Sequence, residues 1–113
     1  DIVSVTGGQT VRQAIRLMHL HDVSQLPVMD GANCVGSVSD WSLSTKSLED
    51  TKMLDVTVSQ VMDAPFPTVD DQQTADSVAK LLSKSNPAVL VRTNGKVTGI
   101  VTRSDLLSYL MSR

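Results

Sequence analysis

The stretch "GIVTRSDLLSYL", residues 99–110, places a threonine, Thr102, at the end of an apolar run and an acid, Asp105, three residues later. This spacing is typical of a helix start, where a threonine caps free backbone N–H groups and an acid reinforces the cap. The same pair also has the chemistry to hold a nucleotide. A helix N-terminus attracts phosphate, the hydroxyl donates a hydrogen bond, and a carboxylate accepts two from a ribose diol. Both interpretations are open on these residues alone.

Other residue types that could do chemistry are isolated from one another. Arg103 and Ser104 adjoin the threonine and could donate to a phosphate. His19 and His21 are two apart on a predicted helix, so they face different ways and are poorly placed to share a metal. Cys34 lies on a predicted strand and is interpreted as a small core residue. Neither a G-x-G-x-x-G nor a Walker A pattern occurs. Since these candidates are isolated, we predict no catalytic residue, metal site or cofactor.

A duplication supplies the elements that must position these residues. Residues 3–18, "VSVTGGQTVRQAIRLM", align with residues 67–82, and residues 26–44 align with residues 89–107. The second alignment places Gly36 on Gly99, Ser39 on Thr102 and Ser42 on Asp105. The shared pattern covers nearly the whole chain, which indicates two copies of one unit.

Each copy has the same predicted order of elements, β-α-β-β-α. The first helix of each copy is capped by Thr10 or Thr74, and Gln13 completes a capping box in the first copy. Asn94-Gly95 is a strong hairpin signal because both residues tolerate positive φ. The predicted strands are 3–5, 26–29 and 34–38, then 68–69, 88–92 and 97–101, and the closing helices are 41–46 and 103–111.

These elements predict an α+β fold of the α/β-sandwich type, with two repeats related by pseudo-two-fold symmetry. We expect the first repeat at residues 1–46, a linker and lead-in helix at 47–64, and the second repeat at 65–113. The lead-in carries Val58, Val61 and Met62 before Pro65 ends it. The first repeat has no such lead-in, and we therefore expect the chain to be a fragment cut close to its first strand.

Composition limits the classes of partner. Hydrophobic residues make up 41% and charged residues 19% of 113 residues, which is typical of one globular chain. The net charge of −2 provides no basic footprint for nucleic acid. With one cysteine and no apolar run of membrane-spanning length, we expect a cytoplasmic protein without membrane contact.

The repeated pattern resembles the CBS domain, two of which form a CBS pair or Bateman module. The matching stretches are "VSQLPVMD" (23–30), "GSVSDWSL" (36–43), "VMDAPFPTV" (61–69), "NPAVLV" (86–91) and "GIVTRSDLL" (99–107). These stretches are similar in sequence to the regulatory regions of cystathionine β-synthase-like enzymes and to archaeal CBS-domain regulators. The resemblance implies a regulatory module that binds AMP, ADP, ATP or S-adenosylmethionine between its repeats. It also implies a homodimer formed through the helices and no catalysis within these residues, so any activity would reside elsewhere in a parent chain.

The resemblance also implies two interleaved clefts. The main cleft centres on Thr102 and Asp105, and the weaker one on Ser37, Ser39 and Ser42. The main cleft would add Arg103, Ser104, Ile100, Asn86, Val3, Ser4, Val23, Ser24 and Gln25, and the weaker one Pro67, Thr68, Pro87 and Ala88.

The first repeat departs from the family pattern, because Ser42 stands where the ribose-binding acid is expected. Asp40 is two residues away and points elsewhere on a helix, so we expect this cleft to be weak or empty. Trp41 could fill the cleft mouth or pack at a dimer face. The alternative function for the whole chain is a dimerisation module with degenerate, ligand-free clefts.

Overall fold

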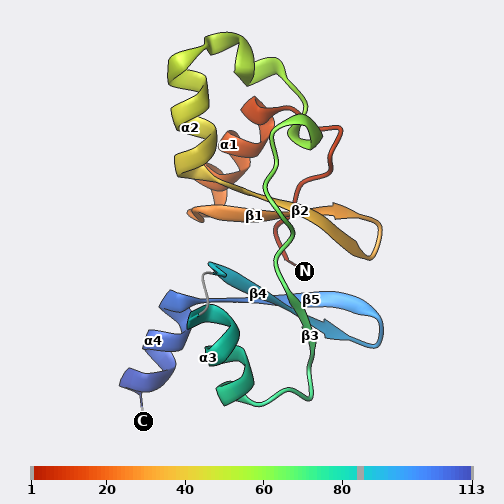
Figure 1. Cartoon of the computed structure of the whole chain (residues 1–113), viewed down its shortest axis with the longest axis vertical. Coiled ribbons are helices and arrows are strands. Elements are labelled where there is room, and N and C mark those ends of the chain that lie inside the picture. Colours follow the sequence, from red (N-terminus) through yellow and green to blue (C-terminus); the bar gives the residue numbers. More distant parts are fainter. Residues whose placement is uncertain (1, 84–85, 113) are drawn as a thin grey trace. The chain divides into compact units, whose positions relative to one another are not determined.

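A computed structural model describes residues 2–83 and 86–112 of the chain. It divides into two compact units, Val3–Pro65 and the residues from Phe66 onward together with Ile2. Each unit places two helices on one side of a small sheet (Figure 1). The first unit contains α1 (Val11–His21), β1 (Gln25–Asp30), β2 (Asn33–Ser39) and α2 (Asp40–Glu49). The second contains β3 (Thr68–Asp70), α3 (Ala75–Ser83), β4 (Ala88–Thr93), β5 (Lys96–Thr102) and α4 (Arg103–Met111). The predicted α+β duplication is confirmed.

The two sheets repeat the same hairpin. Strands β1 and β2 are antiparallel, β4 and β5 are antiparallel, and β3 joins β4 in parallel. Register shifts fall at Val28/Met29 and at Val91/Arg92, which are equivalent positions in the duplication. Asn94 and Gly95 have φ angles of 52° and 79°, as the predicted turn requires.

The helix starts follow the capping residues expected from the sequence. Thr10 accepts a hydrogen bond from the backbone N–H of Gln13, and the Gln13 side chain accepts from the Thr10 N–H at 2.9 Å. Thr74 accepts from the backbone N–H of Ser77 at 3.1 Å. Local hydrogen bonding therefore sets where α1 and α3 begin.

Two predicted elements are wrong in detail. The strand expected at residues 3–5 is reduced to one parallel bridge between Val5 and Val28, because only Val5 exchanges backbone bonds with β1. The lead-in helix is instead two short 3₁₀ helices, η1 (Thr51–Asp55) and η2 (Val58–Gln60). Their backbone bonds go partly to the start of α1, which a local reading of the sequence does not reveal. The assignment of residues 47–64 to a linker stays a prediction, although they fall within the first compact unit.

The core of the first unit includes a residue from that segment. Val58 is fully buried beside residues of α1, α2 and both strands, and Leu54, Val61 and Met62 pack against the same cluster. In the second unit Leu82, Ala88, Val89 and Leu90 are buried. Among the described residues, no helix combines the length and apolar character that crossing a membrane requires.

Candidate functional site

The start of α4 is a direct continuation of β5. Thr102 is the last strand residue and also the N-cap, with an extended backbone at φ −110° and ψ 172°. The chain therefore turns from strand to helix within one residue, and the first N–H groups of α4 are presented at the strand end. Helix N-termini carry partial positive charge, which makes this end suited to an anion.

Asp105 completes a capping box with Thr102. One carboxylate oxygen, Oδ2, accepts from the Thr102 N–H at 2.8 Å and from the Thr102 hydroxyl at 3.0 Å. The Asp105 N–H donates back to the hydroxyl at 3.3 Å. The side chain is exposed, and within the described part of the chain Oδ1 accepts no hydrogen bond. The cap interpretation is therefore confirmed, and it leaves one carboxylate oxygen available.

Arg103 and Asn86 meet at the carboxyl end of α3. The Arg103 Nε donates to the Leu82 carbonyl at 3.1 Å, and the Asn86 Nδ2 donates to the Leu81 carbonyl at 2.9 Å. Both bonds satisfy carbonyl groups that a helix end leaves unpaired. The two terminal nitrogens of Arg103 have no partner among the described residues and remain free to donate.

The remaining residues predicted for the main cleft belong to both units. Ile100 is half-buried in β5 and pairs with Leu90, while Ser104 is exposed in the first turn of α4. In the first unit Val23 and Ser24 precede β1, Gln25 begins it, and Val3 and Ser4 lead to the Val5 bridge on the same strand. Within each unit these residues gather around one strand end, and their union into one cleft stays a prediction.

The first unit repeats the strand-to-helix turn with different side chains. Ser39 caps α2 by accepting from the Ser42 N–H at 3.1 Å. The Ser42 hydroxyl accepts from the Lys46 Nζ at 3.1 Å, and the same ammonium lies 3.3 Å from the Val61 carbonyl. The Asp40 carboxylate is engaged with the Ser44 hydroxyl at 3.1 Å. A serine–lysine pair therefore stands where the second repeat has a capping acid.

The other residues predicted for the weaker cleft are distributed between the units. Ser37 is buried in β2, and its hydroxyl donates to the Ala64 carbonyl at 2.7 Å. In the second unit the Pro67 carbonyl accepts from the Leu90 N–H, and Thr68 begins β3. Pro87 is exposed, whereas Ala88 is buried opposite Thr102 in the sheet.

Sequence reasoning missed the lysine beside Ser42. Lys46 lies four residues after Ser42, and side chains at this separation meet on a helix, so the signal was present. It also missed that Arg103 binds the Leu82 carbonyl at the end of α3, 21 residues earlier in the sequence, and that Asn86 binds the nearby Leu81 carbonyl. No cluster of three metal-ligating side chains occurs within the described ranges.

Comparison with known proteins decides the family. The family model for the CBS domain matches residues 1–49 and again residues 58–112. The chain belongs to the CBS domain family. Because the two matches cover both repeats, the molecule is a tandem CBS pair, and the recognition of this pattern from sequence is confirmed.

Several known proteins are similar over the whole chain. An uncharacterized protein of Methanocaldococcus jannaschii, MJ1232, is 25% identical over all of this chain, which spans 38% of that relative's length. The CBS-pair protein CBSX2 of Arabidopsis thaliana in complex with AMP is 26% identical, with a TM-score of 0.79, over 98% of this chain and 88% of that one. The CBS-domain containing protein ATU1752 of Agrobacterium tumefaciens, at 20% identity, shares the fold with a TM-score of 0.83 over 97% of this chain and 90% of its own.

Proposed function

We propose that this CBS pair is a regulatory module that binds an adenosine-containing ligand, AMP, ADP, ATP or S-adenosylmethionine. The observation that carries the proposal is the unpartnered Oδ1 of Asp105 at the exposed start of α4. A carboxylate held by its other oxygen is already oriented, so a ribose hydroxyl would meet a fixed acceptor. The AMP complex of CBSX2 supports this ligand class.

In this proposal the residues at the start of α4 bind different parts of the ligand. Asp105 accepts from the ribose, while the first N–H groups of α4 and the free Arg103 nitrogens bind phosphate. The Thr102 hydroxyl, which was expected to bind phosphate, already donates to Asp105 and holds its carboxylate in place. Phosphate is favoured here because the helix dipole and a guanidinium both act on it. Asn86 would support this side, and the adenine would lie against Ile100 and the predicted residues of the first repeat.

The first repeat lacks the equivalent acid, and we propose that its cleft binds weakly or not at all. The Ser42 hydroxyl already accepts from Lys46, so it offers less to a ribose than a carboxylate does. Ligand in the main cleft would favour one arrangement of the repeats and bias an attached or partner domain, in proportion to its differential affinity. CBS pairs are regulatory modules, and we propose no catalysis by these residues and a cytoplasmic location.

Calorimetry of the chain with AMP, ATP and S-adenosylmethionine tests the proposal. We expect one ligand per chain, and binding weakened at least about tenfold by Asp105→Ala, since a hydrogen bond to a charged group contributes roughly 1.5–3 kcal/mol. Ser42→Ala changes the equivalent position of the first repeat and is expected to leave the affinity unchanged. Failure of all three ligands to bind, or equal binding by wild type and Asp105→Ala, would contradict the assignment.

A second function, a dimerisation module, is favoured by the apolar side chains that the helices expose. Trp41 and Leu48 of α2 are 82% and 87% exposed, and Leu107 and Met111 of α4 are 62% and 85% exposed. Large apolar side chains at this exposure are typical of surfaces that a partner covers. The two functions are compatible, and a dimer whose melting temperature no nucleotide raises would favour dimerisation alone.

A further inference from the structure

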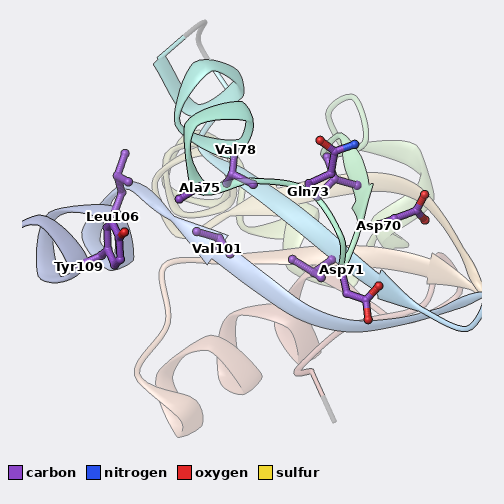
Figure 2. A pocket seen from close by; sticks show the side chains of 10 residues that line it. Asp70, Asp71, Gln73, Ala75, Val78, Val101, Leu106 and Tyr109 are labelled. Carbon is purple, nitrogen blue, oxygen red and sulfur yellow. The ribbon is translucent and has the colours of Figure 1, made fainter.

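A groove of about 350 Å³ opens in the second unit between α3, α4 and the sheet. Figure 2 shows Ala75 and Val78 of α3 on one side, Leu106 and Tyr109 of α4 on another, and Val101 of β5 below them. Its rim toward the end of β3 carries Asp70, Asp71 and Gln73. None of the residues predicted to bind a nucleotide lines it.

The duplication shows what this groove looks like when it is covered. Six apolar lining positions, at 69, 75, 78, 91, 101 and 106, have equivalents in the first repeat. In the second unit none of the six is buried. Their equivalents are each at most 2% exposed, and they are Val5, Val11, Ala14, Val28, Val38 and Leu43. The two repeats therefore differ in whether this surface has a cover.

The cover in the first unit is the segment that leads toward the second repeat. Val58 is 0% exposed within this cluster, and Leu54, Val61 and Met62 pack against it. The segment also pairs with the backbone at the start of α1. The Val11 N–H donates to the Val56 carbonyl at 3.0 Å, and the Gln9 carbonyl accepts from the Val58 N–H at 2.8 Å.

The second unit leaves the same backbone groups without partners. The equivalents of Val11 and Gln9 are Ala75 and Gln73, and in the described part of the chain neither the Ala75 N–H nor the Gln73 carbonyl makes a hydrogen bond. The equivalent glycines, Gly36 and Gly99, show the same difference between the repeats. A Cβ at Gly36 would meet Met62, whereas one at Gly99 would meet only the Val91 Cβ, at 3.8 Å. The groove, the unpaired Ala75 N–H and Gln73 carbonyl, and the space beside Gly99 therefore correspond to the places where the covering segment packs in the first unit.

We propose that this groove binds a lead-in segment similar to Leu54–Met62, joined ahead of Asp1 where the polypeptide continues there. Its apolar side chains would fill the groove and its backbone would pair with Gln73 and Ala75. The position follows from the duplication. Ile2 groups with the second unit, and in the alignment the residues that lead into the first repeat correspond to those that lead into the second.

The groove differs from its counterpart in the first repeat at position 71, and the segment used in the experiment must allow for this difference. Asp71 stands where the first repeat has Gly7, and a Cβ at Gly7 would lie 3.2 Å from the Ser59 Cβ. An exact copy of the segment would therefore crowd Asp71. A glycine at the Ser59 position of the copy removes this contact and leaves the apolar residues unchanged.

The experiment fuses a copy of residues 51–64, with Ser59→Gly in the copy, ahead of Asp1 of the full chain. The matched control carries Val58→Asp and Met62→Asp in the copy only. We expect the fused segment to raise Tm by about 5 °C over the control, because it buries apolar surface that the chain otherwise exposes. We also expect it to slow hydrogen exchange of the Ala75 amide roughly tenfold or more, as a new backbone bond would.

Two further measurements keep the result specific. Gly99→Ala in the fused chain is expected to reduce the Tm gain, since its Cβ would meet the methionine of the copy, while the same change is tolerated in the original chain. Should the fusion fail to fold, the copy is added as a free peptide to the original chain, and Ala75 exchange is read again. Equal Tm for fusion and control, or an Ala75 amide that neither fusion nor peptide protects, would overturn the proposal.

Discussion

Gly36 and Gly99 occupy equivalent places in the two repeats but face different surroundings. A Cβ at Gly36 would meet the Met62 side chain, with Cγ at 2.8 Å, and the Asp63 carbonyl oxygen at 3.1 Å. The methionine can move, but the Asp63 carbonyl is held by its backbone bridge to Ser37. One residue type at one alignment position is therefore required in the first repeat and not in the second.

We predict that Gly36→Ala lowers the free energy of unfolding by about 1–2 kcal/mol, because overpacking forces a segment to shift. Gly99→Ala should stay within about 0.5 kcal/mol of wild type or stabilise slightly, since glycine in a strand costs chain entropy. Urea denaturation followed by circular dichroism measures both. Equal losses from the two substitutions would show that Met62 does not constrain Gly36 as described.

The residues of the candidate site were predictable to the extent that their hydrogen bonds are local. The Thr102–Asp105 box and the Thr10–Gln13 box each lie within four residues, and both were identified from spacing. Arg103 was expected to face a ligand only, yet its Nε binds Leu82, 21 residues earlier. Spacing along one helix cannot show such a bond, because it depends on how α3 and α4 pack.

At the scale of elements, the same division between local and tertiary causes holds. Helices with a cap and an apolar stripe, and strands flanking Asn-Gly, were correctly placed because each signal lies inside the element. Residues 47–64 were predicted to hold a linker and a lead-in helix, yet the segment forms two 3₁₀ helices, η1 and η2. The backbone of this segment pairs with the start of α1 through the Thr10–Thr57 bridge. Its hydrogen-bond partners are therefore distant in the sequence.

This segment should behave as part of the first unit. We predict that Val58→Ala lowers the free energy of unfolding by about 2 kcal/mol, since it removes two buried methyl groups and leaves a cavity. Ser59→Ala, at the exposed neighbour, is the matched control and should change it by less than about 0.5 kcal/mol. Urea unfolding followed by circular dichroism measures both variants. A loss from Val58→Ala no larger than the control's would mean that the segment only bridges the repeats.

At the scale of the whole molecule, the exposed helix faces raise the question of assembly. The family resemblance implies a homodimer formed through the helices, and α2 and α4 carry the apolar side chains that such an interface would use. Burial of these side chains would offset the cost of exposing them in a single chain. Sedimentation of the wild-type chain and of a Leu107→Glu, Met111→Glu variant would test this, with a dimer expected for the first and a folded monomer for the second.

The fluorescence emission of Trp41 can distinguish its two possible roles, because it is the one tryptophan in the chain and is 82% exposed. If it packs at a dimer face, its emission should shift to longer wavelength on dilution, as the ring returns to water, and nucleotide should leave the emission unchanged. If it fills the mouth of the first-repeat cleft, nucleotide should alter the emission at constant protein concentration.

We predict that Trp41 packs at a dimer face, since the Ser42 hydroxyl beside it already accepts from Lys46 and offers a ligand little. The Leu107→Glu, Met111→Glu variant serves as control, and its emission should match that of the diluted wild type. An emission spectrum that responds to AMP and not to dilution would assign Trp41 to the cleft and reopen the first repeat as a binding site.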